Sequence, residues 1–354
     1  MGYRQYDIIK TITDRIAARE YTDKLPRAVD LAEELHVSAV TVNKAILQLV
    51  KRGVLRRKRR DGTRIVPQKY YTGAVIEVLF DGFMSIFSHP FWHHIWEAMI
   101  RELDSEGFRA VITMLKSDPE TGLITLGNRN LLPRDPAMAE DNGARPDFFP
   151  AVGRIILGSY EKRFLSFAEE TQVPFITACD PIDPAIPQVS FDFSDGIHDA
   201  VAYLHERGCR KIGFIGQTQS LIHPRLLNKF HAYLNSVQDY SLVDPSCIGS
   251  TRPVSGGGAA ALQEILKSTV PDALIVAYDT QLSEILHLLN EKKVSIPVIG
   301  CDGLELPDVP ANRPLVRAPL WECGRLAAEK IIQAVHIHRK PKSTYLKAHF
   351  EPGG

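Results

Sequence analysis

Apolar residues recur at helical spacing in three successive stretches near the start of the chain. An apolar residue at about every third or fourth position predicts an amphipathic helix. The positions that define the three stretches are Tyr6, Ile9, Ile12 and Ile16, then Val29, Ala32 and Leu35, and then Val42, Ile46 and Leu49. The sequence therefore predicts three short helices close together.

The second and third of these helices are separated by a short break, and a hairpin follows them. The apolar stripe is interrupted at 36–37, and Ser38 stands at the N-cap position of the third helix. Gly53 follows the last turn of that helix, and the chain then alternates on both sides of Asp61-Gly62, a hairpin-turn dipeptide. Two helices joined by a tight turn predict a helix-turn-helix, with a two-stranded ribbon after it.

From residue 73 onward the pattern changes to buried strands that alternate with amphipathic helices. Strand-like runs are GAVIEVLF, FRAVITML, GRIILGS, VPFITAC, RKIGFIG and DALIVAYD. Strands that alternate with helices predict an α/β fold whose parallel sheets are covered by helices on both faces. A stretch of this length predicts one large or two medium-sized lobes.

The segment 116–150 departs from this rhythm because Pro, Gly and Asn are frequent in it. Long connections of this kind are often functional. A lid over a ligand site, a dimer contact and a surface insertion all fit this composition.

Composition narrows the class of protein. Of the 354 residues 44% are apolar and 24% charged, which is typical of a soluble globular protein. No apolar run is long enough to cross a membrane, and the N-terminus lacks a secretory signal, so we expect a cytoplasmic protein. The five cysteines are scattered singly, which favours reduced thiols over disulfides or a zinc site.

The net charge of zero hides an asymmetry. Residues 1–69 hold 16 Lys and Arg against 8 Asp and Glu, and the rest of the chain has the opposite imbalance. A basic domain on an acidic body is typical of a protein whose small domain contacts a polyanion. A solvated basic face without a partner is the alternative.

The first 66 residues resemble a known DNA-binding family. The pattern LP-x4-LAEEL-x-VS-x2-TV, ending in GT-x-IV, is similar to the winged helix-turn-helix of GntR-family transcription regulators. The resemblance implies that Ala39 and Val29 stand where the family has arginines, so Asn43 or Lys44 would read bases instead. The basic hairpin suits phosphate and minor-groove contact. The DNA-binding residues expected are Arg27, Ser38, Thr41, Asn43, Lys44, Arg59, Arg60, Gly62 and Arg64.

After a linker at 67–72, residues 73–345 resemble the effector-binding region of LacI/GalR-family regulators. The matching stretches are HERGCRKIGFIG, PDALIVAYDTQLSEIL, VSIPVIGCDG and RPLVRAPLWECGRLAAEKII. The resemblance implies the fold of type I periplasmic binding proteins, in which two Rossmann-like lobes enclose a ligand and the chain crosses between them three times. The expected lobes are about 73–185 with 315–340, and about 186–314.

Five residues at strand ends or in loops stand at or near positions where that family binds its ligand. Asp302, in GCDG, matches a ligand-binding aspartate, and Asp180 matches another in the first lobe. Tyr278-Asp279 stands where the family usually has Asn-Asp, and Arg225 lies one position from an arginine that contacts the sugar ring. For each aspartate, a helix cap or turn residue after a strand is the alternative.

The stretch SHPFWHHIW, residues 88–96, stands where the family has Asn-Pro-Phe-Phe. Pro90 is expected at the first position of a helix. By the resemblance, Phe91 or Trp92 would pack on an apolar sugar face or a base, and His89 would offer a hydrogen bond. A zinc site is the alternative, but HExxH is absent. We therefore expect no metal and no cofactor.

These patterns predict a ligand-responsive transcription regulator that works as a homodimer on a palindromic double-stranded DNA operator. The expected effector is a sugar or sugar derivative, with a purine or nucleoside corepressor as the alternative. The family implies repression. A metal-dependent enzyme is the competing class, but the nucleophile-elbow and P-loop motifs are both absent. A glycine run at 256–258 opens a predicted helix and could cradle phosphate.

Overall fold

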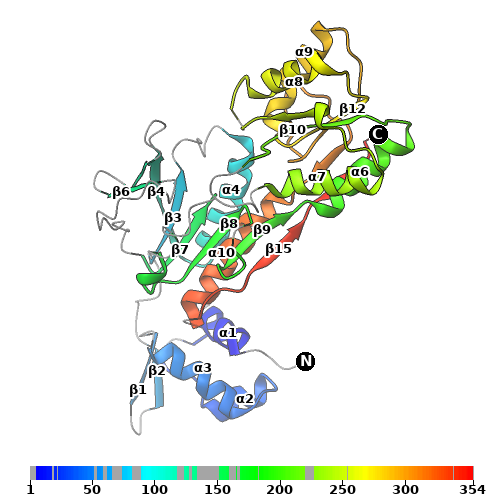
Figure 1. Cartoon of the computed structure of the whole chain (residues 1–354). Helices are drawn as coiled ribbons and strands as arrows, with labels where there is room; N and C mark the ends of the chain where they lie inside the picture. Colours follow the sequence, from blue (N-terminus) through cyan, green and yellow to red (C-terminus); the bar gives the residue numbers. More distant parts are fainter. Residues whose placement is uncertain are drawn as a thin grey trace.

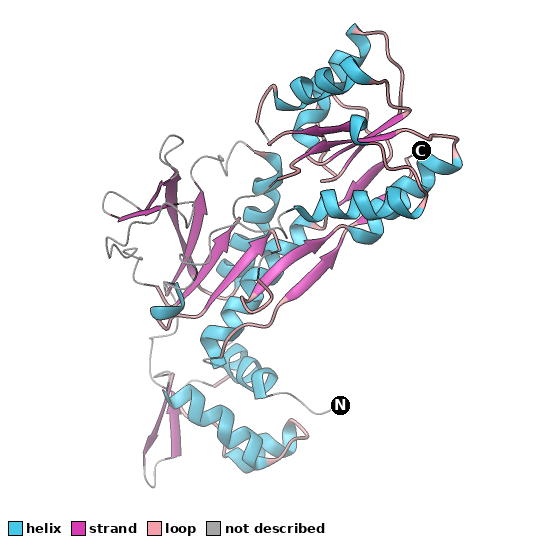
Figure 2. Ribbon diagram, viewed as in Figure 1, coloured by secondary structure: helices cyan, strands magenta, loops and turns pink. Residues whose placement is uncertain are grey.

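The computed structural model contains a small N-terminal domain, here called the head, and a larger two-lobed part, here called the body (Figure 1). Figure 2 shows that the head is mainly helical and that helices cover the strands of the body. The structure describes residues 5–17, 20–21, 23–51, 54–58, 62–65, 74–81, 89–117, 123–126, 130–133, 151–158, 165, 168–181, 183–219, 227–252, 254–337 and 339–353.

The head has three helices and a hairpin, as predicted. Its elements are α1 (Gln5–Ala17), α2 (Ala28–Glu34), α3 (Ala39–Lys51), β1 (Leu55–Lys58) and β2 (Gly62–Ile65). The two strands pair antiparallel, and an isolated bridge between Lys24 and Arg64 extends the ribbon. One core holds the helices together, and it includes Ile8, Ile12, Leu31, Val42, Ile46 and Leu49.

The apolar stripe predicted for the second helix is partly wrong. Val29 is 64% exposed, and Leu31 is buried instead at 1% exposed. In a helix as short as α2, the core contacts lie on the face that carries Leu31, Ala32 and Leu35, so the isolated valine in its first turn stays outside. Periodicity locates the helix here but not its buried face.

The turn between α2 and α3 has the geometry of a helix-turn-helix. His36 adopts a left-handed backbone with φ 53°, which reverses the chain direction within two residues. Ser38 accepts a hydrogen bond at its Oγ from the backbone N–H of Thr41 at 3.1 Å. The predicted N-cap is thereby confirmed, since a cap satisfies one of the orphan donors of the first helical turn.

The first lobe of the body is built on an eight-stranded sheet in the order β15-β9-β8-β7-β3-β4-β5-β6. Its strands from β15 to β4 are parallel, and their buried apolar runs fit a sheet that is covered on both faces. Helices α4 and α10 pack against each other, and α10 also packs on the sheet. The bounds are β3 (Val75–Asp81), β4 (Arg109–Ser117), β7 (Gly153–Leu157), β8 (Phe175–Cys179), β9 (Gln188–Asp192), β15 (Thr344–Lys347), α4 (Pro90–Ser105) and α10 (Leu320–Ile337).

The segment that broke the rhythm, 116–150, adds two strands to this sheet. They are β5 (Leu123–Leu126) and β6 (Asn130–Pro133), which pair antiparallel with β4 and with each other. Sequence composition predicted a long connection without these strands. Most of the segment lies outside the described residues, so its three possible roles remain hypotheses.

The second lobe is built on a six-stranded sheet in the order β11-β10-β12-β13-β14-β16, in which only the β14–β16 pairing is antiparallel. Helices α6 and α7 pack together, and α8 packs with α9. The bounds are β10 (Ile212–Gly216), β11 (Ile248–Ser250), β12 (Ala273–Val276), β13 (Val298–Gly300), β14 (Leu315–Arg317), β16 (His349–Glu351), α6 (Ser194–Glu206), α7 (Asn228–Asp239), α8 (Gly257–Ser268) and α9 (Leu282–Glu291).

The chain passes between the two lobes at three places in the described residues. It leaves the first sheet after β9, returns from β14 through α10, and leaves again between β15 and β16. The last crossing consists of a single residue, Ala348, which is 1% exposed. The crossing pattern predicted from the sequence is therefore present.

Candidate DNA-binding surface and inter-lobe site

The start of α3 presents a short row of polar side chains on the surface of the head. The hydroxyl oxygens of Ser38 and Thr41 lie 2.7 Å apart, so the two side chains hold each other in place. Lys44 is exposed, and the side-chain oxygen of Asn43 accepts a hydrogen bond from Arg57 of β1. The hairpin is thereby fixed against the helix, through an arginine that sequence reasoning counted only as part of a basic run.

Two of the arginines expected to hold phosphate form ion pairs. Arg27 makes a bidentate contact with Asp30 at 2.9 Å for both hydrogen bonds, and its side chain is 84% exposed. Arg64 contacts both carboxylate oxygens of Asp23 at 2.7 and 2.8 Å. Exposed pairs of this kind contribute little free energy, so a phosphate can replace the carboxylate.

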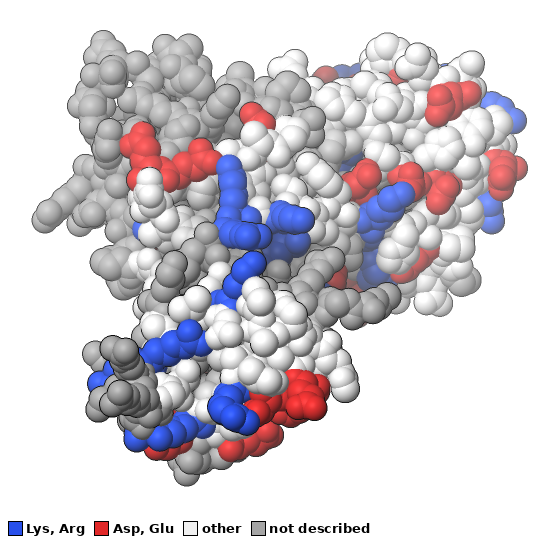
Figure 3. All heavy atoms as spheres, turned by 90° about the horizontal axis from the view of Figure 1, so that it is seen from below, with Lys and Arg blue, Asp and Glu red and all other residues white. Residues whose placement is uncertain are grey.

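Gly62 opens β2 with φ 83°, a conformation that favours glycine, as the hairpin turn requires. Arg59 and Arg60 lie outside the described residues. Figure 3 shows Lys and Arg side chains spread over the visible face of the head, with acidic side chains gathered at one edge.

The first-lobe wall of the inter-lobe site is made by the start of α4. His89 precedes the helix and Pro90 stands in its first turn, as predicted. Both ring nitrogens of His89 and the Nε1 atom of Trp92 are buried without a hydrogen-bond partner among the described residues. Burial lowers the pKa of His89, and the carboxylate of Asp302 in the second lobe acts on it in the opposite direction. The charge of Asp302 in the second lobe therefore reaches His89 in the first.

A row of aromatic rings connects this wall with β9, the strand after which the chain first leaves the first lobe. Trp92 packs into the core against Phe80, with ring centroids 5.2 Å apart. Phe91 is half-buried and lies 6.2 Å from Phe191 of β9. Phe193 follows at 6.0 Å from Phe191. Of the two aromatics proposed from the sequence, Phe91 is therefore the more accessible one.

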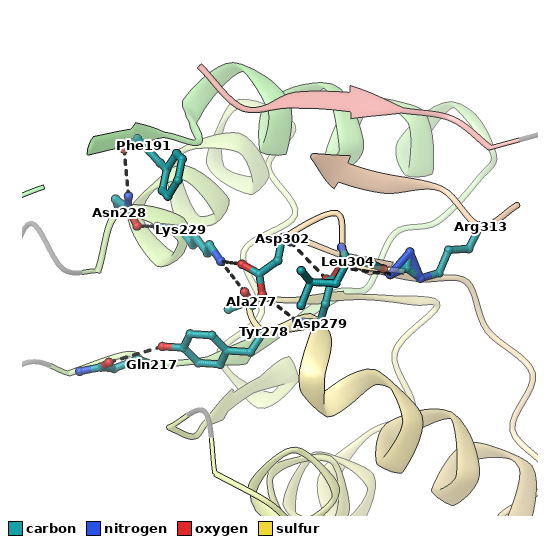
Figure 4. Close-up of polar contacts among 10 residues, drawn as sticks. All are labelled: Phe191, Gln217, Asn228, Lys229, Ala277, Tyr278, Asp279, Asp302, Leu304 and Arg313. Atoms are coloured by element: carbon teal, nitrogen blue, oxygen red, sulfur yellow. Dashed lines mark hydrogen bonds and ion pairs between the residues drawn. The ribbon is translucent and has the colours of Figure 1, made fainter. Parts of the chain in front are cut away.

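The second-lobe wall contains two buried aspartates at the carboxyl ends of neighbouring strands (Figure 4). Asp279 follows β12 and is 0% exposed, whereas Asp302 follows β13 and is 4% exposed. Asp302 accepts hydrogen bonds from the Asp279 backbone N–H at 2.9 Å and from Lys229 at 2.6 Å. Adjacent parallel strands end at the same edge, which is where such sheets bind ligands.

Asp279 has a mainly structural set of partners. Its carboxylate accepts hydrogen bonds from the backbone N–H groups of Asp302 at 3.2 Å and Leu304 at 2.8 Å, and from Arg313 at 3.1 Å. Burial and the charge of Asp302 raise the pKa of Asp279 to about 6. These contacts fit the alternative of a turn residue after a strand better than a role as a ligand acceptor.

Lys229, at the start of α7, was missed by sequence reasoning. Its ammonium group also donates to the carbonyl oxygen of Ala277 at 2.6 Å and lies 4.6 Å from the ring centroid of Phe193. Burial alone lowers the pKa of Lys229, but the carboxylate of Asp302 more than offsets this, and the pKa is raised. In the sequence, Lys229 is visible only as a lysine near apolar residues at the start of a helix, and this does not indicate a place in the inter-lobe site.

Tyr278 and Asp180 complete the inter-lobe site. The hydroxyl of Tyr278 donates to Gln217 at 3.4 Å, and its ring centroid lies 5.5 Å from the ammonium of Lys229. Burial raises the pKa of Tyr278, and the charge of Asp180, which follows β8 in the first lobe, raises it further. Arg225 lies outside the described residues.

Two other chemistries considered from the sequence find little support in the structure. Among the described residues, no group of three or more His, Cys, Asp or Glu side chains is placed to hold a metal ion. The glycine run at the start of α8 already binds a carboxylate, because Glu284 accepts from the N–H groups of Gly256 and Gly258 at 2.7 and 2.6 Å. A phosphate could bind there only if it displaced the carboxylate of Glu284.

A cavity of about 390 Å³ lies away from this site, between α4 and β4 of the first lobe. It contains none of the residues predicted to bind an effector, and is lined by Trp96, Ile100, Leu103, Asp104, Phe108, Ala110 and Ile112. Among the described residues, no helix is both long and apolar enough to span a bilayer.

Comparison with known proteins finds matches to the head and to the C-terminal part of the body. Residues 5–65 match the model of bacterial regulatory proteins of the gntR family, and residues 201–354 match that of the periplasmic binding protein-like domain. The HTH-type transcriptional regulator GalR of Streptococcus thermophilus is 28% identical over 156 residues, which are 41% of this chain and 46% of that protein. The chain thus matches about half the length of this curated relative.

Solved structures share the fold of the chain. A complex of the transcriptional regulator CelR with cellobiose has a TM-score of 0.64 at 18% identity, over 90% of this chain and 91% of that one. The lac repressor dimer bound to operator and the anti-inducer ONPF has a TM-score of 0.61 at 17% identity, over 79% of this chain and 93% of that one. These similar proteins are transcription regulators, not enzymes.

Proposed function

We propose that this chain, which joins a GntR-type winged helix-turn-helix to a periplasmic-binding-protein-like body, is a transcription regulator whose DNA affinity depends on a small molecule between its lobes. The observation that carries the proposal is the first-lobe wall, where His89 and Trp92 hold buried polar atoms without partners in the part of the chain that the structure describes. Such atoms cost free energy unless something binds them. A ligand between the lobes would supply the missing hydrogen bonds.

More specifically, we propose that the effector is a sugar or sugar derivative and that the protein represses transcription. The CelR–cellobiose complex, whose fold this chain shares, supports a carbohydrate in the body. The half-buried ring of Phe91, backed by Phe191, offers an apolar surface that suits the apolar face of a sugar ring. The protein would act in the cytoplasm.

The lac repressor dimer supports a homodimer on a palindromic operator. In a dimer the two heads must reach half-sites separated by about 34–36 Å or a multiple of it. A ligand that changes the angle between the lobes would change the spacing of the heads. By linkage, DNA and effector then alter each other's affinity by the same factor.

A purine or nucleoside corepressor is the second candidate. The half-buried ring of Phe91 would stack on a flat base as readily as on a sugar ring. The two candidates differ in the sign of the response, because a corepressor strengthens DNA binding and an inducer weakens it.

The proposal is tested with DNA fragments selected by the full-length protein from random sequence. Their affinity is measured by fluorescence anisotropy with and without sugars, sugar derivatives and purines. His89→Ala should keep DNA affinity but lose the ligand response. His93→Ala is the matched control, because His93 lies on the same helix with its side chain 53% exposed. A DNA affinity that no compound in the panel changes would contradict the proposal.

A further inference from the structure

Lys229 lies between the two lobes with part of its hydrogen-bonding capacity unused. A lysine ammonium group has three N–H donors. Two of them reach Asp302 and the carbonyl oxygen of Ala277, both at 2.6 Å. The ammonium lies between the rings of Phe193 and Tyr278, and the Lys229 side chain is 13% exposed. One donor therefore has no oxygen acceptor in the part of the chain that the structure describes.

The carboxylates beside Lys229 are engaged within the protein. Both oxygens of Asp279 accept hydrogen bonds, from two backbone N–H groups and from Arg313. Both oxygens of Asp302 also accept, one from Lys229 and one from a backbone N–H. The hydroxyl groups of a neutral sugar would have to compete for these oxygens. The second-lobe wall of the site thus offers a ligand a hydrogen-bond donor more readily than a hydrogen-bond acceptor.

The opposite wall adds a second group that can donate. The side chain of His89 is buried in the first lobe, and neither of its ring nitrogens has a hydrogen-bond partner among the described residues. A neutral imidazole carries one N–H donor, and an imidazolium carries two. An acceptor group held between His89 and Lys229 would contact both lobes at once. Phe91 and Phe191 lie beside this position and offer an apolar surface.

We propose that Lys229 determines the specificity of the inter-lobe site, and that the effector carries an oxyanion, a carboxylate or a phosphate, on a ring with an apolar face. This inference rests on the proposed function, because it concerns the ligand of the same site. Hydrogen bonds between an ammonium group and an oxyanion are about twice as strong as neutral ones. The oxyanion takes the remaining donor of Lys229 and the imidazole of His89, while the ring packs on Phe91.

Calorimetric titration of the full chain tests this with probes that share one ring. The probes are D-glucose, D-glucuronate and D-glucose 6-phosphate, together with the corresponding galactose series. At least one oxyanion probe should bind about tenfold or more tighter than its neutral sugar. Whether the carboxylate or the phosphate series binds identifies the source of the charge, and either result supports the inference.

Variants distinguish the binding of the oxyanion by Lys229 from the role of Lys229 as the counter-ion of Asp302. Lys229→Met leaves Asp302 buried without its counter-ion, so the double variant Lys229→Met/Asp302→Asn keeps the site neutral. Both variants should bind the oxyanion probe about tenfold or more weakly than the parent protein. Lys267→Met is the matched control, because the side chain of Lys267 is 69% exposed in an ion pair with Glu264. It should leave the affinity unchanged.

Three results would overturn the inference: a neutral sugar that binds as tightly as its oxyanion, no binding of any oxyanion probe, or an unchanged affinity in the double variant. The proposed function fails separately. If an oxyanion binds but leaves the DNA affinity of the full chain unchanged, the regulator hypothesis is wrong and the inference about Lys229 stands. If only a neutral sugar changes the DNA affinity, the regulator hypothesis stands and the inference about Lys229 is wrong.

Discussion

The head and the body use the same kinds of charged residues in opposite ways. In the head, Arg27 pairs with Asp30 on the surface, with side chains 84% and 44% exposed. In the body, Arg313 pairs with Asp279 and Arg154 with Glu77, and all four side chains are less than 10% exposed. Water and salt compete with the Arg27–Asp30 pair of the head and hardly reach these two pairs of the body. Exposed pairs leave cations available to a polyanion, whereas buried pairs hold strand ends in place.

The largest effect is expected when a buried pair is broken. Asp279→Ala leaves Arg313 buried without its carboxylate and removes the acceptor of two backbone N–H groups. We expect the free energy of unfolding to fall by about 3–5 kcal/mol. Chemical denaturation of the full chain measures it, with Glu264→Ala, which breaks an exposed pair, as control. Equal effects of the two substitutions would remove the distinction between buried and exposed pairs.

A smaller effect is expected from the cap of α3. Ser38→Ala removes the oxygen that accepts from the Thr41 N–H, and should cost about 1 kcal/mol of stability. Ser38→Thr keeps an oxygen at this position and should cost less. If both substitutions lower the unfolding temperature of the head equally, the hydroxyl of Ser38 is not acting as a cap.

Arg64→Ala should hardly change stability, by about 0–1 kcal/mol, because its pair with Asp23 is partly exposed. The effect should appear in DNA binding instead. Each lost phosphate contact reduces the slope of log K against log salt by about 0.9. Anisotropy titrations at several salt concentrations measure this slope, and Lys267→Ala in the body provides the comparison. An unchanged slope for Arg64→Ala would show that the pair with Asp23 persists on DNA.

The smallest effect is expected from the titration of His89. Burial lowers its pKa in the folded protein, so the unfolded chain takes up the proton first as the pH falls. The contribution of His89 to the free energy of unfolding is complete above the ordinary histidine pKa of about 6.5, and it declines as the pH drops below that value. His89→Gln should therefore reduce the loss of melting temperature between neutral and mildly acidic pH. His93→Gln, at an exposed position, should leave the pH dependence as it is.

The sequence predicted the elements well because their signals are local. Helical spacing located all three helices of the head, and Ser38 is the cap that its position indicated. Continuous apolar runs located β3, β7 and β8, since strands buried on both faces carry no alternation. The face that α2 buries depends on the partner helices, which is why Val29 was misplaced.

The site was less accessible to sequence reasoning because it depends on distant residues. His89 and Asp302 were found because each stands at the end of a recognisable strand–helix unit. Lys229 carries no such signal, and its role is visible only when α7 brings it within 2.6 Å of Asp302, 73 residues further along the chain. For Asp279 the resemblance suggested a ligand contact, but its partners are mainly backbone groups and Arg313.

The single-residue joint at Ala348 has a consequence for synthesis of the protein. β15 is the edge strand of the first sheet and β16 the edge strand of the second, and only Ala348 separates them. During translation, neither lobe can complete its sheet until residues 344–351 have left the ribosome. The two lobes therefore complete their sheets together, once residues 344–351 have been made, and a chain cut before residue 344 would lose an edge strand from both.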